Sequence, residues 1–307
     1  MLIRTATAAE VAEPADLAPP DPVVSVGREA YLAEVAAGRM RPEWTWYALD
    51  GSRVVARALW WGREDSDRPL TLDCLHVLPG VPDRVALATE LLERAHAEFG
   101  TRPEYRVIRG SGLGDPAVAD AVSWRAAAAR AAGLTDVVER LRYEWTPEAG
   151  VPAPSRRLVF RPAPDDEFLA LFRRAAVGSL DVATRRDLET MDADEQAQAD
   201  LEFYLSCPGE RSWWRVATTP EGDPVGFAVP SATPYHRNVG YLGVLPERRG
   251  QGYVDDLLGE ITRVHADGGA ERITATTDVP NKPMAAAFDR AGYSVTEVRT
   301  VFTAPSR

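Results

Sequence analysis

The sequence has few cysteines, few histidines and no long apolar run. Its 307 residues include only two cysteines, Cys74 and Cys207, and four histidines. Two distant cysteines cannot build a disulfide framework or a cysteine zinc site, and this usage fits a reducing cytosol. The histidines lack zinc-type spacing, so we expect no metal. No segment reaches the roughly 18 consecutive apolar residues of a membrane-spanning helix, so we expect no membrane partner.

Positive charge is also scarce. Lys282 is the only lysine, and the 46 acidic residues outnumber the 35 basic ones, giving a formal net charge of −11. A domain that coats nucleic acid is normally basic, so we expect no nucleic-acid partner. A negative surface favours encounter with small cations such as amines. The first residues form no apolar segment of the secretory kind, so we expect a cytoplasmic protein, either a monomer or a homodimer.

Several catalytic motifs are missing as well. Neither Gly-x-x-x-x-Gly-Lys-Ser/Thr nor Gly-x-Gly-x-x-Gly occurs, which excludes a Walker loop and a dinucleotide fingerprint. Gly-x-Ser-x-Gly and His-Glu-x-x-His are absent too, so nothing supports a hydrolase.

The chain instead reads as two similar halves. Its length suggests about two domains, and the proline-rich segment 147–156 has the composition of a linker. Val77–Pro79 matches Val244–Pro246, and Ala132-Gly133 matches Ala291-Gly292, each pair in corresponding positions. We therefore predict a tandem duplication, with one domain at 1–146 and a second at 157–307.

Apolar periodicity predicts the same order of helices and strands in both halves. In the first half we expect strands at 2–5, 44–49, 54–60, 70–78 and 134–145, and helices at 28–37, 83–98 and 117–132. In the second half we expect strands at 158–161, 213–217, 225–229, 239–245, 272–277 and 293–302, and helices at 165–176, 192–206, 252–266 and 283–291.

The loop Arg249-Gly250-Gln251-Gly252 lies between a strand that ends at Pro246 and an amphipathic helix. A helix N-terminus presents unpaired N–H groups and a partial positive charge. Glycines allow a phosphate to approach the backbone, and an arginine adds a forked donor. The pattern predicts a site for a phosphate or pyrophosphate.

This stretch resembles the GNAT N-acetyltransferase superfamily, whose pattern is Arg/Gln-x-x-Gly-x-Gly/Ala after such a strand. A second family segment, Asn-x-x-Ala-x-x-Leu-Tyr-x-x-x-Gly-Phe, is similar to the run from Asn281 to Tyr293. The resemblance covers residues 156–303 firmly and 1–146 weakly. It implies two α+β halves, each a mixed, mostly antiparallel sheet flanked by helices.

The resemblance also implies a site for acetyl-CoA as the acyl donor. The pyrophosphate would lie on the loop, and the pantetheine arm would pair with the preceding strand and contact Asn281. A backbone N–H near Val244 would polarise the thioester carbonyl, and an amine would attack the acyl group directly. The implied loop residues are Arg249, Gly250, Gln251, Gly252, Tyr253 and Val254, and the implied strand residues are Leu242, Gly243 and Val244.

Three departures from the family pattern stand out. Val254 occupies a position where glycine or alanine is usual, which would crowd a pyrophosphate. Phe288, expected beside the bound donor, stands where the family often has a tyrosine that protonates the leaving thiolate. The first half has no Arg-Gly-x-Gly at the corresponding loop, so we expect a degenerate copy that does not bind CoA productively.

Four side chains are candidates for chemistry at the acceptor. Tyr241 and Asp278 are candidate catalytic bases. The alternatives are that Tyr241 is a packed aromatic residue and that Asp278 is a turn residue or a helix cap. Asp181 and His236 are candidate contacts for the acceptor. The alternative for His236 is a solvated histidine in an exposed loop. The acidic run from Asp187 to Glu202 is either a solvated helix face or a lip that attracts a polyamine or an aminoglycoside.

Together these observations predict an N-acetyltransferase that moves the acetyl group of acetyl-CoA to an amine of a small molecule. Two alternatives stay open. One is a non-catalytic protein that binds acyl-CoA as a sensor, which the phenylalanine at 288 and the valine at 254 favour. The other is a transferase that uses a longer acyl-CoA.

Overall fold

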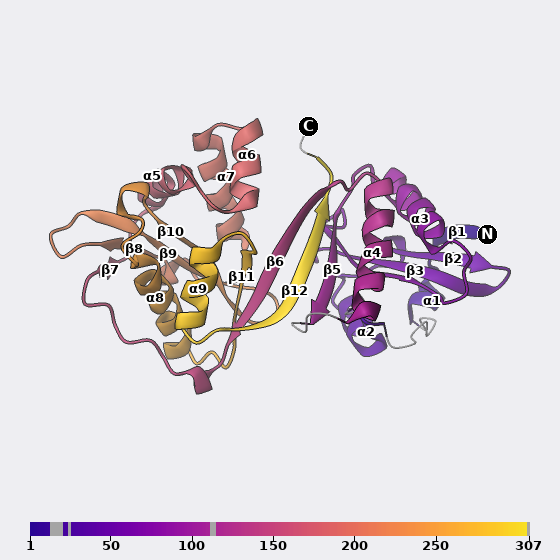
Figure 1. Cartoon of the computed structure of the whole chain (residues 1–307), viewed down its shortest axis with the longest axis horizontal. Helices are drawn as coiled ribbons and strands as arrows, with labels where there is room; N and C mark the ends of the chain where they lie inside the picture. The colour runs from indigo at the N-terminus through magenta and orange to yellow at the C-terminus, as the bar shows by residue number, and fades with distance from the viewer. Residues whose placement is uncertain (13–20, 24–25, 111–114, 306–307) are drawn as a thin grey trace. The chain divides into compact units, whose positions relative to one another are not determined.

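The structure is a computed structural model that describes residues 1–12, 21–23, 26–110 and 115–305 (Figure 1). Two units divide the chain. Unit 1 comprises residues 1–139 with 297–305, and unit 2 comprises residues 140–296. In the described part of the chain, no helix combines the length and the apolar character needed to cross a bilayer.

Unit 1 is built on strands in the order β1-β2-β3-β4-β5-β12, antiparallel except for the parallel pair β4–β5. Helices α3 and α4 pack against each other on one face, as Figure 1 shows, and α2 covers the other. The elements are β1 (Leu2–Thr5), α1 (Ala8–Ala12), α2 (Arg28–Ala36), β2 (Thr45–Asp50), β3 (Arg53–Trp61), β4 (Thr71–Val77), α3 (Arg84–Phe99), β5 (Glu104–Gly110), α4 (Pro116–Ala131) and, from the end of the chain, β12 (Ser294–Thr303).

Unit 2 repeats this plan with strands in the order β6-β11-β10-β9-β8-β7, of which β10 and β11 run parallel. The elements are β6 (Asp136–Trp145), β7 (Val159–Arg161), α5 (Asp165–Ala176), α6 (Val182–Thr190), α7 (Ala193–Ser206), β8 (Arg215–Thr218), β9 (Pro224–Ala232), β10 (Arg237–Val244), α8 (Tyr253–Asp267), β11 (Ile273–Asp278) and α9 (Lys282–Arg290).

Alternation along β9 explains why helices cover both faces of the unit 2 sheet. Phe227 and Val229 point to one side and join the core under α5 and α7, whereas Ala228 points to the other and joins the core under α8 and α9. The helices carry apolar residues at matching intervals, such as Phe168 and Phe172 of α5. The predicted fold class, a mixed sheet flanked by helices in each half, is confirmed.

In each unit, the strand at one edge of the sheet comes from the other half of the sequence. Strand β12 pairs with β5 in unit 1, and β6 pairs with β11 in unit 2. Phe302 of β12 is fully buried in the unit 1 core and stacks on Tyr105 with ring centroids 6.0 Å apart. The units therefore differ from the sequence-based domains 1–146 and 157–307 in where these two strands belong.

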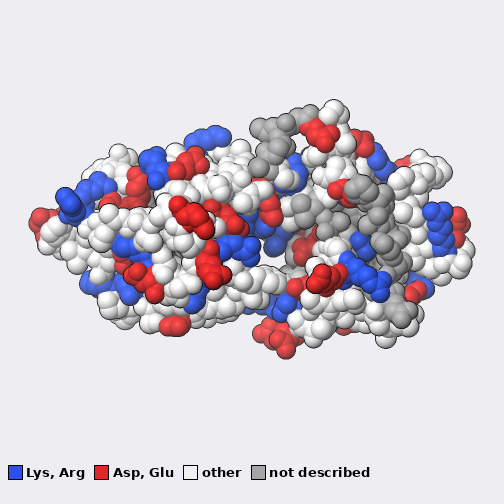
Figure 2. Space-filling view, turned by 90° about the horizontal axis from the view of Figure 1, so that it is seen from below, with Lys and Arg blue, Asp and Glu red and all other residues white. Residues whose placement is uncertain are grey.

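Charged side chains are spread over the surface in both signs. Figure 2 shows acidic and basic residues interspersed on the face that it presents. Many are paired, as in Arg84–Asp120 at 2.6 Å and Arg248–Asp223 at 2.8 Å. Exposed pairs of this kind contribute little to stability, so we attribute the fold to its apolar cores.

Replacing Phe302 with alanine should destabilise unit 1 by about 3–5 kcal/mol, because it empties a buried site to which the distant β12 contributes. Urea unfolding measures the change. Phe203→Ala is the matched control, because that ring is 51% exposed, and it should change the free energy of unfolding little. Equal losses of unfolding free energy in both variants would contradict the role of Phe302 in attaching β12 to the core of unit 1.

Candidate active site

The site lies where the pairing between β10 and β11 ends. The two strands pair only at Arg237↔Ile273 and Asn238↔Thr274. The register of β10 against β9 then shifts by one residue between Asn238 and Tyr241, which marks a β-bulge. Gly240 within it has a φ of 70°, and a Cβ there would lie 2.2 Å from the carbonyl oxygen of Val229. Only glycine fits this bulge, and beyond it β10 runs apart from β11.

A cavity of about 630 Å³ fills the opening. Its walls come from β10, β11, the start of α9, and the helices α6 and α7, all of unit 2. Lining it are Arg140, Ser179, Leu180, Asp181, Ala183, Thr184, Asp187, Ala199, Asp200, Phe203, Tyr204, Asn238, Val239, Gly240, Tyr241, Leu242, Ala275, Thr276, Thr277, Asp278, Asn281, Met284 and Phe288.

The diverging edge of β10 offers backbone groups to a ligand. Leu245 donates its N–H to Val225 of the β9 side at 2.9 Å, and the carbonyl of Gly243 also faces β9. Because backbone groups alternate along a strand, the N–H groups of Leu242 and Val244 face the open side. Gly243 is required here, because a Cβ would lie 2.5 Å from the ring of Phe227.

The loop before α8 presents a second set of backbone donors. Gly250 and Gly252 have φ values of 74° and 75°, which turn the chain into the first turn of this 15-residue helix. Among the described residues, no backbone or side-chain acceptor meets the N–H groups of residues 250–254. Such a concave array of free N–H groups at a helix N-terminus fits a phosphate.

The guanidinium of Arg249 is bound by backbone carbonyls. Its guanidinium donates to the carbonyls of Ala175 at 2.7 Å, Val177 at 2.8 Å, Gly178 at 3.0 Å and Val244 at 3.1 Å. Most of its N–H groups are thus used to hold the C-terminal end of α5 against the loop. Arg249 thereby shapes the loop before α8, and its contact with a phosphate stays a prediction.

Arg157 lies beside the same loop, and sequence motifs gave no signal for it. It donates to the carbonyls of Gln251 at 2.9 Å and Gly252 at 3.3 Å, pairs with Asp256, and lies over the ring of Tyr253 at 4.7 Å. The other carboxylate in this turn, Asp255, pairs with Arg290 at 2.7 Å. Both acidic residues at the start of α8 are therefore compensated.

Tyr241 lies in an aromatic cluster on the cavity wall. Its ring stacks on Tyr204 at 5.4 Å and contacts Phe172 and Phe227. Burial raises the pKa of the phenol well above its usual value, and the neighbouring carboxylates of Asp200 and Asp181 raise it further. A phenol that holds its proton so tightly is a poor base, so the arrangement favours the packed-aromatic interpretation.

Asp278 also lines the cavity, but its carboxylate is occupied. One oxygen accepts from Arg140 at 2.9 Å and the other from the backbone N–H of Val182 at 2.7 Å. It thereby ties the start of α6 to the end of β11, which is the capping role left open by the sequence. Asn281 similarly caps α9 by accepting from Met284 at 3.4 Å.

Three carboxylates form the acidic wall of the cavity: Asp181, Asp187 and Asp200. Asp181 caps α6 by accepting from Thr184 at 2.8 Å. Burial raises the pKa of Asp200 to about 6; the hydrogen bond from Gln196 opposes this rise, and repulsion from Asp187 and Asp181 adds to it. Sequence reasoning found Asp200 only as one member of a long acidic run, because its burial depends on how α7 packs.

The rest of that acidic run stays outside the cavity. Asp192 and Glu195 form a capping box at the start of α7, Asp194 pairs with Arg173 at 2.9 Å, and Glu202 accepts from Gln198 at 2.7 Å. The run is therefore mainly a solvated helix face, and only Asp187 and Asp200 turn inward.

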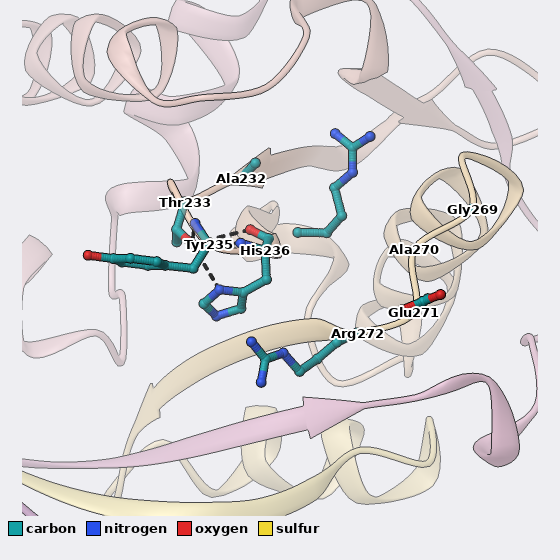
Figure 3. A pocket seen from close by; sticks show the side chains of 9 residues that line it. Ala232, Thr233, Tyr235, His236, Gly269, Ala270, Glu271 and Arg272 are labelled. Carbon is teal, nitrogen blue, oxygen red and sulfur yellow. Dashed lines mark hydrogen bonds between the residues drawn. The ribbon is translucent and has the colours of Figure 1, made fainter. Parts of the chain in front are cut away.

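His236 lies apart from the other candidates, in a second cavity of about 560 Å³. Its Nδ1 lies 3.0 Å from the hydroxyl of Thr233, and Arg142 donates to its Nε2 at 2.5 Å. Figure 3 shows the imidazole between Thr233 and Arg272. The structure thus separates His236 from Tyr241 and Asp278.

Phe288 and Val254 belong to one apolar core. Phe288 is 2% exposed and stacks on Tyr143 at 4.7 Å and Tyr293 at 5.3 Å. Val254 packs against the same cluster rather than over the free N–H groups of the loop. Its predicted crowding of a pyrophosphate therefore has no counterpart in this arrangement.

The corresponding opening of unit 1 is filled. Strands β4 and β5 also pair at only two positions, Thr71↔Glu104 and Leu72↔Tyr105. Arg125 of α4 then enters the gap, donates to the carbonyl of Leu75 at 3.0 Å and pairs with Asp21, which contacts His76 at 3.1 Å. Among the described residues, a cavity of only about 10 Å³ lies beside Arg125.

Residues 180–293 match the family model of the Acetyltransferase (GNAT) family. This segment is similar to that family, and it contains most of the cavity lining, the loop before α8 and α8 itself. A comparison with curated proteins found no match.

Solved structures are similar to the whole chain in fold. A GCN5-related N-acetyltransferase from Sphaerobacter thermophilus aligns with a TM-score of 0.59 and 15% identity, over 98% of this chain and 94% of that one. A functionally unknown protein from Staphylococcus epidermidis aligns with a TM-score of 0.52 and 11% identity, over 85% and 94%. A fungal glucosamine N-acetyltransferase region aligns with a TM-score of 0.50 and 13% identity, over 91% of this chain and 38% of that one. At these identities the likeness concerns the fold alone.

Replacing Asp200 with asparagine should stabilise the protein at neutral pH. The pKa of this carboxyl rises from 3.8 unfolded to about 6 folded, so the folded state binds the proton more tightly. The ionised carboxylate therefore costs up to about 3 kcal/mol above pH 6 and nothing below about pH 4. Thermal unfolding at several pH values measures the gain, which should vanish as the pH falls.

Asp194→Asn is the matched control for this measurement. Its carboxylate is on the same helix and is 76% exposed in its pair with Arg173. It should give little change in stability at any of these pH values. A pH-independent gain for Asp200→Asn would show that burial of the charge is not its cause.

Proposed function

We propose that unit 2 transfers the acetyl group of acetyl-CoA to an amino group of a small molecule. The observation that carries this proposal is the divergence of β10 from β11 beside the free N–H groups of the α8 loop. A ligand with an extended arm and a pyrophosphate fits both features, the arm along β10 and the pyrophosphate at the loop. The family match supports acyl transfer in general, and the identity of donor and acceptor is our proposal.

Backbone groups hold the donor in this proposal. The N–H groups of residues 250–254 bind the pyrophosphate. Arg249 fixes the loop against the end of α5, and Arg157 adds positive charge beside the loop. The N–H groups of Leu242 and Val244 pair with the pantetheine arm. The N–H of Val244 would donate to the thioester oxygen as negative charge develops on it. The bound donor supplies the activated acyl carbon.

Asp200 is the group best suited to accept the proton of the ammonium. A base works best when its pKa lies near the working pH, and burial raises the pKa of Asp200 to about 6. The nitrogen gives one proton to this carboxylate, forms the bond to the acyl carbon and breaks the bond to sulfur. The departing thiolate takes the second proton that the nitrogen sheds, so Phe288 need not supply one.

Unit 1 has no such role in our proposal. Arg125 and Asp21 occupy the gap where a pantetheine arm would pair with β4. The corresponding loop also lacks the Arg-Gly-x-Gly sequence. We therefore propose that unit 1 is a degenerate copy that does not bind CoA.

The first test combines calorimetric titration of CoA with thiol release from acetyl-CoA in the presence of amines. Gly252→Ala should weaken CoA binding at least about tenfold, because a side chain at its φ of 75° distorts the loop. Gly222→Ala is the matched control, since Gly222 has a φ of 96° in the turn between β8 and β9. Tight CoA binding without thiol release would favour the sensor alternative, and absence of CoA binding would overturn the proposal.

The pH dependence of kcat/KM tests the role of Asp200. The rate should rise as the pH passes about 6, because the carboxylate must be ionised to accept a proton. Asp200→Asn should lower kcat about 100-fold or more and remove this rise. Asp194→Asn, on the exposed face of α7, should retain both. A pH profile unchanged in Asp200→Asn would assign the base elsewhere.

A further inference from the structure

Two large apolar side chains are exposed on the cavity wall. Leu180 precedes α6 and is 48% exposed, and Phe203 of α7 is 51% exposed. Single exposed apolar side chains are common on protein surfaces, but apolar side chains exposed inside a concave site mark a binding region. These two come from separate segments, so the cavity has apolar surface on two of its walls.

Each of these side chains lies next to a carboxylate. Leu180 directly precedes Asp181, and Phe203 lies one helical turn after Asp200 on the same face of α7. The cation nearest to them on the cavity wall, Arg140, is already paired with Asp278 at 2.9 Å. The wall therefore offers negative charge and apolar surface side by side.

The hydroxyl of Tyr241 adds a polar group to the cavity floor. Its ring is largely buried in the aromatic cluster, and within the described ranges the structure shows no hydrogen-bond partner for its oxygen. The carboxylates and this phenol are hydrogen-bond acceptors on the same cavity wall. An ammonium can donate to all of these, and an uncharged apolar body can cover the two exposed side chains.

We infer that the acceptor is a primary amine with a single positive charge and an apolar body, which rests on Leu180 and Phe203 while its ammonium faces Asp181 and Asp200. This inference rests on the proposed function of the same cavity and narrows it. A second charge, or a row of hydroxyl groups, that lies against Leu180 and Phe203 would lose its hydration there without a hydrogen bond from these two side chains. The polyamine and aminoglycoside acceptors suggested by the acidic run are therefore disfavoured.

Three amines of equal heavy-atom number test the inference: hexylamine, 2-(2-aminoethoxy)ethanol and 1,5-diaminopentane. Their binding to the whole protein saturated with CoA is measured by calorimetry, and thiol release from acetyl-CoA is measured in parallel. Hexylamine should bind at least about tenfold more tightly than the other two. Phe203→Ser or Leu180→Ser should reduce this preference to about threefold or less, with CoA affinity unchanged.

Leu205→Ser is the matched control, because Leu205 is on the same helix, is 45% exposed and does not line this cavity. It should keep the preference for hexylamine. If hexylamine is preferred but no thiol is released, the inference stands and the proposed acyl transfer fails. Equal or tighter binding of either polar amine, no binding of any amine, or an unchanged preference in both cavity variants would overturn the inference.

Discussion

The short pairing between β10 and β11 is the constraint on which the site depends. A parallel pair would normally continue along both strands, but the bulge at Gly240 turns β10 away after two residues. The separation frees the N–H groups of Leu242 and Val244 and makes room for a cavity between the strands. Asp278 then fixes the opposite wall, because its carboxylate holds both Arg140 and the start of α6.

The two halves show how one fold can keep or lose a site. Both contain a parallel pair that separates after two positions. In unit 2 the gap stays open, whereas in unit 1 the guanidinium of Arg125 satisfies the carbonyl of Leu75 and is itself neutralised by Asp21. A buried arginine is tolerated there only because these partners are present. Fold similarity alone would not have distinguished the two halves.

The sequence was informative wherever function depends on local backbone chemistry. The glycines at 250 and 252, the strand before them and the helix after them predicted a loop with free N–H groups at a helix N-terminus, and the repeat predicted two similar units. Residue roles that depend on contacts distant in sequence were not predictable. Arg249 reaches carbonyls more than 70 positions away, and the burial of Asp200 depends on how α7 packs.

Helix α6 and strand β5 were missed for local reasons. Helix α6 has nine residues and a single buried one, so it carries almost no periodic signal. Strand β5 alternates buried residues with arginines, and its partner β12 lies far along the chain. The exchange of β6 and β12 could not be foreseen either, because each half has a strand at its end and nothing in the order of elements says which sheet it joins.

That exchange has a consequence for the order in which the protein is made. During synthesis, the N-terminal domain of a chain generally folds first. Here β12 follows every strand of unit 2 in the sequence, so the β5 edge of unit 1 has no partner until unit 2 has been translated. Unit 2, in contrast, receives β6 before any of its own strands emerges. Unit 2, which carries the cavity, can therefore be completed first. Until β12 is made, the β5 edge of unit 1 stays unpaired.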